Sequence, residues 1–231
     1  VRNVSGISAL TGGISLTGAT RINSGGTLTI SMVGISGATQ DLSVGGAGNT
    51  TISSAIGTTT GGLTKDGDGT LTLSGTNTYS GATTITAGIN AGTLALDGTG
   101  TIAASSGVAN EGTFTIAAGK TIDSLTGTGA TTLGGNLTIG DTDNTDGVYS
   151  GIASGSGGLI KEGTGTLTLS GANAYIGLTT INAGILEDQN GSALADTGLV
   201  AIADIHGAIL AVMCSETTVT MYGGRTTGRA I

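Results

Sequence analysis

The chain has 231 residues, of which 46 are glycine and none is proline or tryptophan, and its formal net charge is −8. Only 10% of the residues are charged, whereas an ordinary globular domain has about 25%. No lysine and arginine cluster is present, so we expect no nucleic-acid partner. The single cysteine, Cys214, excludes an internal disulfide framework. No apolar run is long enough for a membrane-spanning helix, so we expect no membrane span within this segment.

Short runs in which aliphatic residues alternate with threonine predict β-strands along the chain. Such alternation places aliphatic side chains inside and threonines outside. Glycine after each strand is expected to supply positive φ at the corners. With one phenylalanine and no tryptophan, the core must be built from small aliphatic side chains, which suits a narrow solenoid. The predicted strands are 27–30, 70–73, 83–86, 93–96, 113–116 and 166–169.

A long internal repeat is the main signal. The block from Gly61 to Gly88 returns at Gly157 to Gly184, with 20 of 28 positions identical at an offset of 96. A weaker similarity relates 42–57 to 137–155. We therefore predict an all-β fold, a right-handed parallel β-helix (solenoid) that forms one segment over 1–231. Long repeats are expected at 61–156 and 157–231, after a partial copy at 1–60.

A finer spacing lies within the large repeat. Apolar centres recur every 19 to 24 residues, which suits rungs of two or three short strands that need their neighbours to bury the inner face. These centres fall near Leu28, Ile52, Leu71, Leu94, Phe114, Leu137 and Leu159.

The pattern GxLTKxGxGTLTLSGxNxYxGxTTIxAG, present at 61–88 and 157–184, closely resembles the autotransporter-associated β-strand repeat of bacterial type V secretion passengers. The resemblance implies a passenger that is exported across the outer membrane through a C-terminal translocator and folds outside as a β-helix. It links the repeat to secretion and folding of the stalk, and carries no specific catalytic activity. The first residues lack a signal-peptide pattern, and we expect the chain to be part of a longer protein.

Two pairs of polar residues occupy equal places in the two copies. Asn77 and Asn173 are expected to face inward at a corner and to hydrogen-bond backbone groups of their turn. Tyr79 and Tyr175 are expected to cover the core at an end or corner, although an aromatic ring can also stack on a sugar.

Two acidic turns raise the question of calcium. The first, Asp141 to Gly147, has closely spaced carboxylates, but its spacing differs from the EF-hand loop. The second, Lys65 to Gly69, faintly resembles a Gly/Asp calcium repeat, but its partner at Lys161 to Gly165 lacks the carboxylate pattern. We interpret both as turns.

No catalytic, cofactor or metal-binding residue is predicted. His206 is the only histidine, and Cys214 has no evident base, so neither a catalytic triad nor a metal site is expected. Enzymes that act on polysaccharides also use the β-helix, but their sites gather carboxylates with arginine or lysine on one face. Here the basic residues are scattered over the sequence, at Arg2, Arg21, Lys65, Lys120, Lys161, Arg225 and Arg229.

The threonine-rich strands suggest an alternative, an ice-binding or filament-forming solenoid. Thr-x-Thr recurs at Thr27, Thr70, Thr84, Thr113 and Thr166, but the uneven rung spacing in the sequence argues against a regular array. The favoured hypothesis is therefore a non-catalytic structural or adhesive stalk, secreted or on the cell surface. Its expected partners are a host or neighbouring cell surface or matrix, and other copies of itself, end to end or laterally, because open strand edges promote pairing.

Overall fold

The computed structural model describes residues 1–31, 33–87, 92–140, 146–189, 194, 200–203, 208–212 and 221–222. The described residues form strands, turns and bends, and no helix among them is long and apolar enough to cross a membrane. The chain divides into two compact units, Val1–Ala117 (unit 1) and Ala118–Ile231 (unit 2). Within each unit every strand pair is parallel, as in a β-helix.

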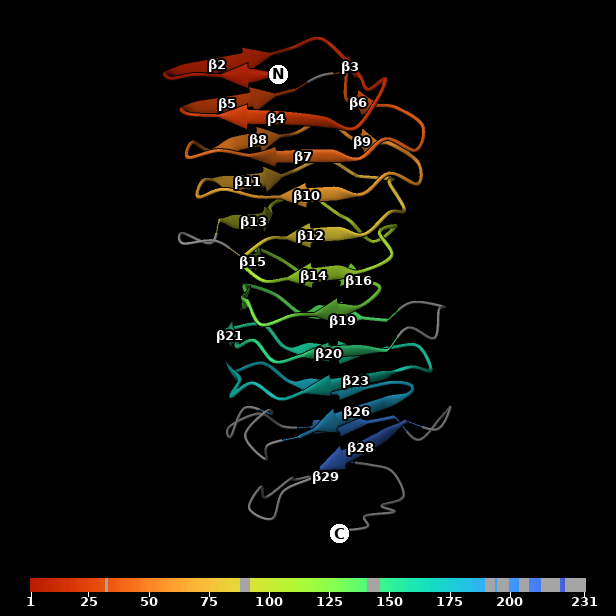
Figure 1. The fold of residues 1–231 in the computed structure, drawn as a ribbon. Helices are drawn as coiled ribbons and strands as arrows, with labels where there is room; N and C mark the ends of the chain where they lie inside the picture. Colours follow the sequence, from red (N-terminus) through yellow and green to blue (C-terminus); the bar gives the residue numbers. More distant parts are fainter. Residues whose placement is uncertain are drawn as a thin grey trace. The chain divides into compact units, whose positions relative to one another are not determined.

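Unit 1 is a coil of three parallel sheets whose strands lie one above another (Figure 1). Its first three rungs each supply one strand to every sheet, and later rungs supply strands to sheets I and II. Sheet I contains β1 (Arg2–Asn3), β4 (Thr20–Ser24), β7 (Leu42–Gly45), β10 (Leu63–Lys65), β12 (Thr83–Ile85) and β14 (Val108–Asn110). Sheet II contains β2 (Ile7–Leu10), β5 (Thr27–Ile30), β8 (Thr50–Ile52), β11 (Thr70–Leu73), β13 (Thr93–Leu96) and β15 (Thr113–Ile116). Sheet III contains β3 (Ile14–Ser15), β6 (Ile35–Ser36) and β9 (Ile56–Gly57).

Unit 2 is also built from stacked parallel strands. Sheet IV contains β16 (Lys120–Ile122), β19 (Leu137–Ile139), β22 (Leu159–Lys161), β25 (Thr179–Ile181), β27 (Val200–Ile202) and β29 (Met221–Tyr222). Sheet V contains β20 (Gly147–Tyr149), β23 (Thr166–Leu169), β26 (Ile185–Asp188) and β28 (Ile209–Val212). Sheet VI contains β18 (Ala130–Leu133), β21 (Ala153–Gly155) and β24 (Ala174–Tyr175), and β17 (Leu125–Thr126) is a further strand of this unit.

The core of each unit consists of the aliphatic side chains that alternate with threonine. Leu71 is fully buried and lies between Thr50 and Leu94 of the neighbouring rungs. Its counterpart Leu167 is 1% exposed and lies between Gly147 and Leu186. The two copies of the long repeat therefore have equivalent environments, and the predicted parallel β-helix fold is confirmed.

The apolar centres recur at about the length of one rung, but they do not form a single ladder of paired residues. Ile52 stacks on Ile30 and Leu73, whereas the residue between Leu28 and Leu71 is the buried Thr50. Leu137 and Leu159 pair with each other in sheet IV, whereas Leu167, the counterpart of Leu71, lies in sheet V. The spacing was close to one rung in either case, so sequence distance alone did not reveal that the ladder changed sheets.

The rungs differ in length although the long repeat keeps its period. In unit 1, Leu71 pairs with Leu94, which pairs with Phe114. In unit 2, Leu167 pairs with Leu186, which pairs with Leu210. The offset between the copies is thus 96 at the first position, 92 at the second and 96 again at the third. Four residues have moved from one rung to the next, and the strand register is unchanged. The partition into 1–60, 61–156 and 157–231 stays a prediction.

Glycines at the corners serve two different needs. Gly67 and Gly163 adopt positive φ, +66° and +65°, as predicted for the residues that follow a strand. Gly75 and Gly171, also predicted to need positive φ, do not have it. A side chain there would instead collide with the backbone of the previous rung, at Ser54 and Gly151 respectively. At these two corners the close approach of successive rungs requires glycine.

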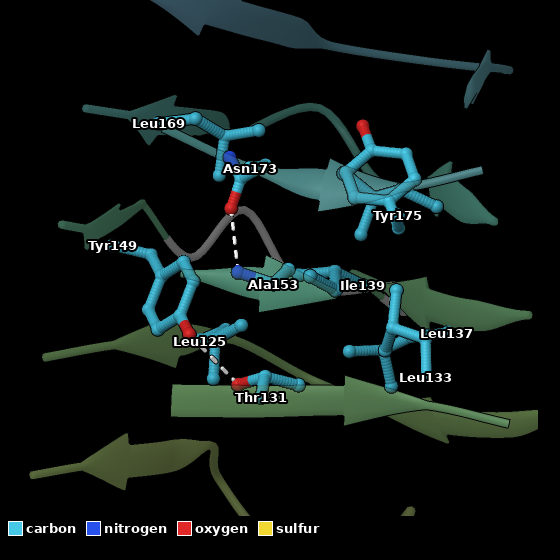
Figure 2. A pocket seen from close by; sticks show the side chains of 11 residues that line it. Leu125, Thr131, Leu133, Leu137, Ile139, Tyr149, Ala153, Leu169, Asn173 and Tyr175 are labelled. Carbon is cyan, nitrogen blue, oxygen red and sulfur yellow. Dashed lines mark hydrogen bonds between the residues drawn. The ribbon is translucent and has the colours of Figure 1, made fainter. Parts of the chain in front are cut away.

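A small cavity in unit 2 lies where a large and a small side chain replace the two isoleucines found at the same places in unit 1. Tyr149 occupies the place of Ile52, since each pairs with the equivalent leucine of the next rung, Leu169 or Leu73. Four residues later, Ala153 replaces Ile56. Figure 2 shows Tyr149 and Ala153 beside the cavity, whose volume is about 10 Å³, close to the minimum for one water molecule. The larger tyrosine thus compensates for most of the volume that the alanine leaves.

This exchange predicts a strong coupling between positions 149 and 153. Ala153→Ile alone should overfill the site and lower the free energy of unfolding by about 1–3 kcal/mol. The double variant Tyr149→Ile/Ala153→Ile recreates the pair found in unit 1, so it should be more stable than the sum of the single changes by about 0.5–3 kcal/mol. Urea unfolding followed by circular dichroism gives the free energy of unfolding of the unmodified chain, the two single variants and the double variant. Additive effects would contradict the compensation.

Candidate functional site

Buried asparagines tie neighbouring rungs together at equal places in the two copies. The Asn77 side-chain oxygen accepts the N–H of Ile56 at 2.9 Å, and its amide group donates to the carbonyls of Gly75 and Thr101 at 3.2 and 3.0 Å. Asn173 accepts the N–H of Ala153 at 2.7 Å (Figure 2). The predicted inward, backbone-bonding role is confirmed, and the bonds reach the adjacent rungs as well as the residue's own turn.

At two further corners an Asp or Asn side chain also accepts a backbone N–H of the next rung, and the sequence analysis predicted neither. At the entry to sheet I, Asp41 accepts the N–H of Gly62 at 2.8 Å, and in unit 2 Asn136 accepts the N–H of Gly158 at 2.9 Å. At the next corner, Asn49 accepts the N–H of Thr70 at 2.9 Å, and Asp146 accepts the N–H of Thr166 at 2.6 Å. We call these Asp and Asn contacts, with those of Asn77 and Asn173, the corner bridges. The signal was available, because Asp or Asn recurs at these places in the weaker 42–57 and 137–155 similarity or just before it.

Three tyrosines lie inside the coils and pair with buried threonines. Tyr79 and Tyr175 are each 1% exposed, and their hydroxyls contact the Oγ1 atoms of Thr83 and Thr179 at 2.8 and 2.7 Å. The Tyr149 hydroxyl donates to Thr131 Oγ1 at 2.9 Å and to the Gly129 carbonyl at 2.7 Å. The core interpretation of Tyr79 and Tyr175 is confirmed, because a fully buried ring cannot stack on a sugar.

Two lysines also point inward, which the sequence reading did not predict. Lys65 and Lys161 are each 2% exposed. The Lys65 ammonium donates to the carbonyls of Asp66 and Gly67, both at 2.7 Å, and Lys161 donates to those of Glu162 and Gly163. Burial lowers the pKa of both lysines, and nearby carboxylates partly oppose this shift. Strand alternation was the missed signal, because each lysine lies two residues after an inward leucine in β10 or β22.

The turn beside each buried lysine is closely approached by a glycine of the following rung. A side chain at Gly92 would collide first with the Gly67 carbonyl and then with the Lys65 ammonium. One at Gly184 would collide first with the carbonyls of Gly163 and Gly165 and then with the Lys161 ammonium. In the sequence repeat Gly184 aligns with Gly88, but in the fold Gly92 takes its role, because this rung of unit 1 is four residues longer. The turn predicted at 65–69 is therefore confirmed as structural.

The remaining candidate residues are brought together only in part. Arg21 forms an ion pair with the Asp66 carboxylate, whereas the neighbouring Lys65 donates to the Asp66 backbone carbonyl. Over the parts of the chain that are described, no group of three His, Cys, Asp or Glu side chains is arranged to hold a metal ion. Several predicted positions lie outside the described residues, namely 141–145 of the acidic turn, His206, Cys214, Arg225 and Arg229.

Comparison with known proteins identifies the two blocks. Residues 63–96 and 159–187 match the passenger-associated-transport-repeat family. The chain is also 35% identical over 174 residues to the adhesin BmaC autotransporter of Brucella suis biovar 1 (strain 1330). That alignment covers 72% of this chain and 5% of the relative. The chain carries the repeats of an autotransporter passenger. No solved structure matches it.

The matched blocks of this passenger segment coincide with its buried polar contacts. The first runs from β10 to the end of β13 and contains Lys65, Asn77 and Tyr79; the second runs from β22 into β26 and contains Lys161, Asn173 and Tyr175. Each block therefore supplies one inward lysine, one corner bridge and one buried tyrosine. The lysines and asparagines bond to backbone groups and the tyrosines to threonine hydroxyls, so each block supplies contacts that hold the coil in register.

The corner bridge at Asn77 predicts a large loss of stability when it is removed. Asn77→Ala leaves the Ile56 N–H and two carbonyls without their partner, at a cost of about 1–3 kcal/mol for each group that stays unsatisfied. Thr78→Ala, at the exposed neighbouring position, is the matched control and should change stability by no more than about 0.5 kcal/mol. Thermal unfolding compares the two, and equal losses would refute the role of the bridge.

The buried tyrosines predict an alkaline loss of stability. Burial raises the pKa of Tyr149 and Tyr175 to about 12 and that of Tyr79 further still, from an ordinary value of 10.0. Because the folded pKa is higher, the stabilisation is complete below pH 10 and is lost as the pH rises from 10 towards 12, by roughly 1.4 kcal/mol per pH unit for each group. In a Tyr222→Phe background, tyrosinate absorbance should appear only with unfolding. Reversible ionisation near pH 10 in the folded protein would contradict the burial.

Proposed function

We propose that this chain is a surface-exposed, adhesive and non-catalytic segment of an autotransporter passenger stalk. The proposal rests on where the polar side chains of the matched blocks lie. The lysine, asparagine and tyrosine of each matched block are buried and bonded to backbone or threonine groups within the coil. Groups of this kind, when held inside a coil, contribute to folding, which leaves contact with a partner to the outward threonines and to exposed apolar side chains such as Ile176.

The proposed location and activity are supported by the comparisons. Passenger-associated repeats and an adhesin relative point to a segment exported to the cell surface or secreted. The chain corresponds to 5% of the relative's length, so adhesion by the whole protein is transferred to this segment as a hypothesis. The binding partner would be a host or neighbouring cell surface, matrix, or another copy.

Self-association is the more specific part of the proposal. Parallel strands stacked in a coil can pair edge to edge with those of a second copy, so homotypic contact is included among the proposed partners.

Expression of the full-length gene on the surface of a non-adherent bacterial strain tests the proposal. Expressing cells should bind host cells or matrix, or clump with each other while labelled non-expressing cells stay dispersed, the latter outcome indicating homotypic contact. In-frame removal of this 231-residue segment should abolish that activity, while an epitope elsewhere in the passenger still labels at the surface. Undiminished adhesion by the deletion variant would show that the segment is a spacer only.

A further inference from the structure

The outward face of sheet II in unit 1 carries threonines in two parallel files. The first file contains Thr27, Thr70, Thr93 and Thr113, with Asn49 between the first two, and the second contains Thr29, Thr51, Thr72 and Thr115, with Ala95 between the last two. Successive residues of a file are partners in the strand register, so Asn49 separates Thr27 from Thr70 and Ala95 separates Thr72 from Thr115. We call these eight residues the threonine face.

The hydroxyls of the threonine face make no hydrogen bond within the described part of the chain. Threonines elsewhere in unit 1 behave differently: the hydroxyls of Thr20, Thr58 and Thr99 donate to the carbonyls of Gly18, Gly61 and Ser74. The face therefore presents hydroxyl and methyl groups that are available to a ligand. Each β-branched side chain is stiff about χ1, and its neighbours in the file restrict it further.

The spacing of this face is regular, which corrects the sequence argument against an array. Rungs of unequal length still pair in register, so the hydrogen-bond ladder sets the distance between rungs. That distance is about 4.8 Å, and threonines two residues apart on one strand are about 6.7 Å apart. The rungs differ in length only in the connections between strands, so the spacing of the threonines on the face stays even.

In ordered water, oxygen atoms recur at nearly the same distance as the threonines along one file. In a tetrahedral network each O–H···O bond spans about 2.75 Å, so oxygens two bonds apart are separated by about 4.5 Å. A file of threonine hydroxyls can therefore substitute for a row of such oxygens with a mismatch of a few tenths of an ångström. Many identical weak contacts add up only against a ligand that is itself periodic.

The composition of the face favours ice over a sugar or a charged partner. The threonine face has no charged side chain and no aromatic ring on which a sugar could stack. The outward side of sheet I, in contrast, carries the Arg21–Asp66 ion pair. Sheet V of unit 2 has a broken pattern, because Val148, Thr168 and Glu187 stand in one file and the Thr168 hydroxyl donates to Glu187.

We propose that the threonine face binds the surface of ice crystals. This activity goes beyond adhesion to cells, and the two can fail independently, because adhesion is assayed with cells above freezing. Thr51 and Thr72 are central to the face and pair with each other on β8 and β11.

Ice-affinity partitioning of the whole 231-residue chain tests the proposal. The protein should concentrate in slowly grown ice, and Thr72→Tyr and Thr51→Tyr should each lower the incorporated fraction by at least about tenfold, which corresponds to 1.4 kcal/mol. Tyrosine is compatible with a strand, and circular dichroism verifies folding. Thr84→Tyr, on the outward side of sheet I, is the matched control and should partition like the unmodified chain.

Three results would overturn the proposal. The unmodified chain could stay in the liquid fraction, as an ordinary soluble protein does. Thr84→Tyr could lose as much incorporation as Thr72→Tyr, which would remove the link to this face. Finally, the chain could bind crystalline cellulose or chitin and fail to enter ice, which would assign the face to a glycan surface.

Discussion

Hydrogen bonds between successive rungs hold this coil together, along the strands and through many of the turns between them. Where a turn N–H lacks a backbone partner, an Asp or Asn side chain supplies one, and the bonds of Asn77 and Asn173 do so in the interior, where an unpaired group is costly. Here Asp and Asn side chains accept the N–H groups of adjacent rungs at three corners of each unit. Strand pairing sets the register, and these side-chain bonds hold the turns of neighbouring rungs together.

The interior combines aliphatic side chains with polar ones, many of which are hydrogen-bonded. Lysine ammonium groups bind turn carbonyls, and tyrosine hydroxyls meet threonine hydroxyls. A satisfied polar network specifies one arrangement more strictly than leucine contacts alone, since any slip of a strand would leave several groups unpaired. For a repetitive sequence, in which many registers have similar apolar contacts, this strictness has particular value.

The fold could be predicted from the sequence because the repeat and the strand alternation are both strong. Asn77 and Tyr79 could be assigned because both copies keep them. The inward position of Lys65 was missed because the residue was assigned to the turn 65–69, although alternation from Leu63 puts it inside. The exchange of Ile52 and Ile56 for Tyr149 and Ala153 could not be anticipated, since it requires knowing which side chains share one layer of the core. Likewise, no sequence spacing reveals that rungs of unequal length keep an even register.

The transfer of four residues from one rung to the next has a consequence for how such passengers diversify. Strand pairing fixes the pitch, while the connections between strands change in length without disturbing it. Loop closure becomes only slightly less favourable as a connection grows. A gene encoding this architecture can therefore acquire new surface segments by small insertions at the corners, with each addition carried on an unaltered scaffold.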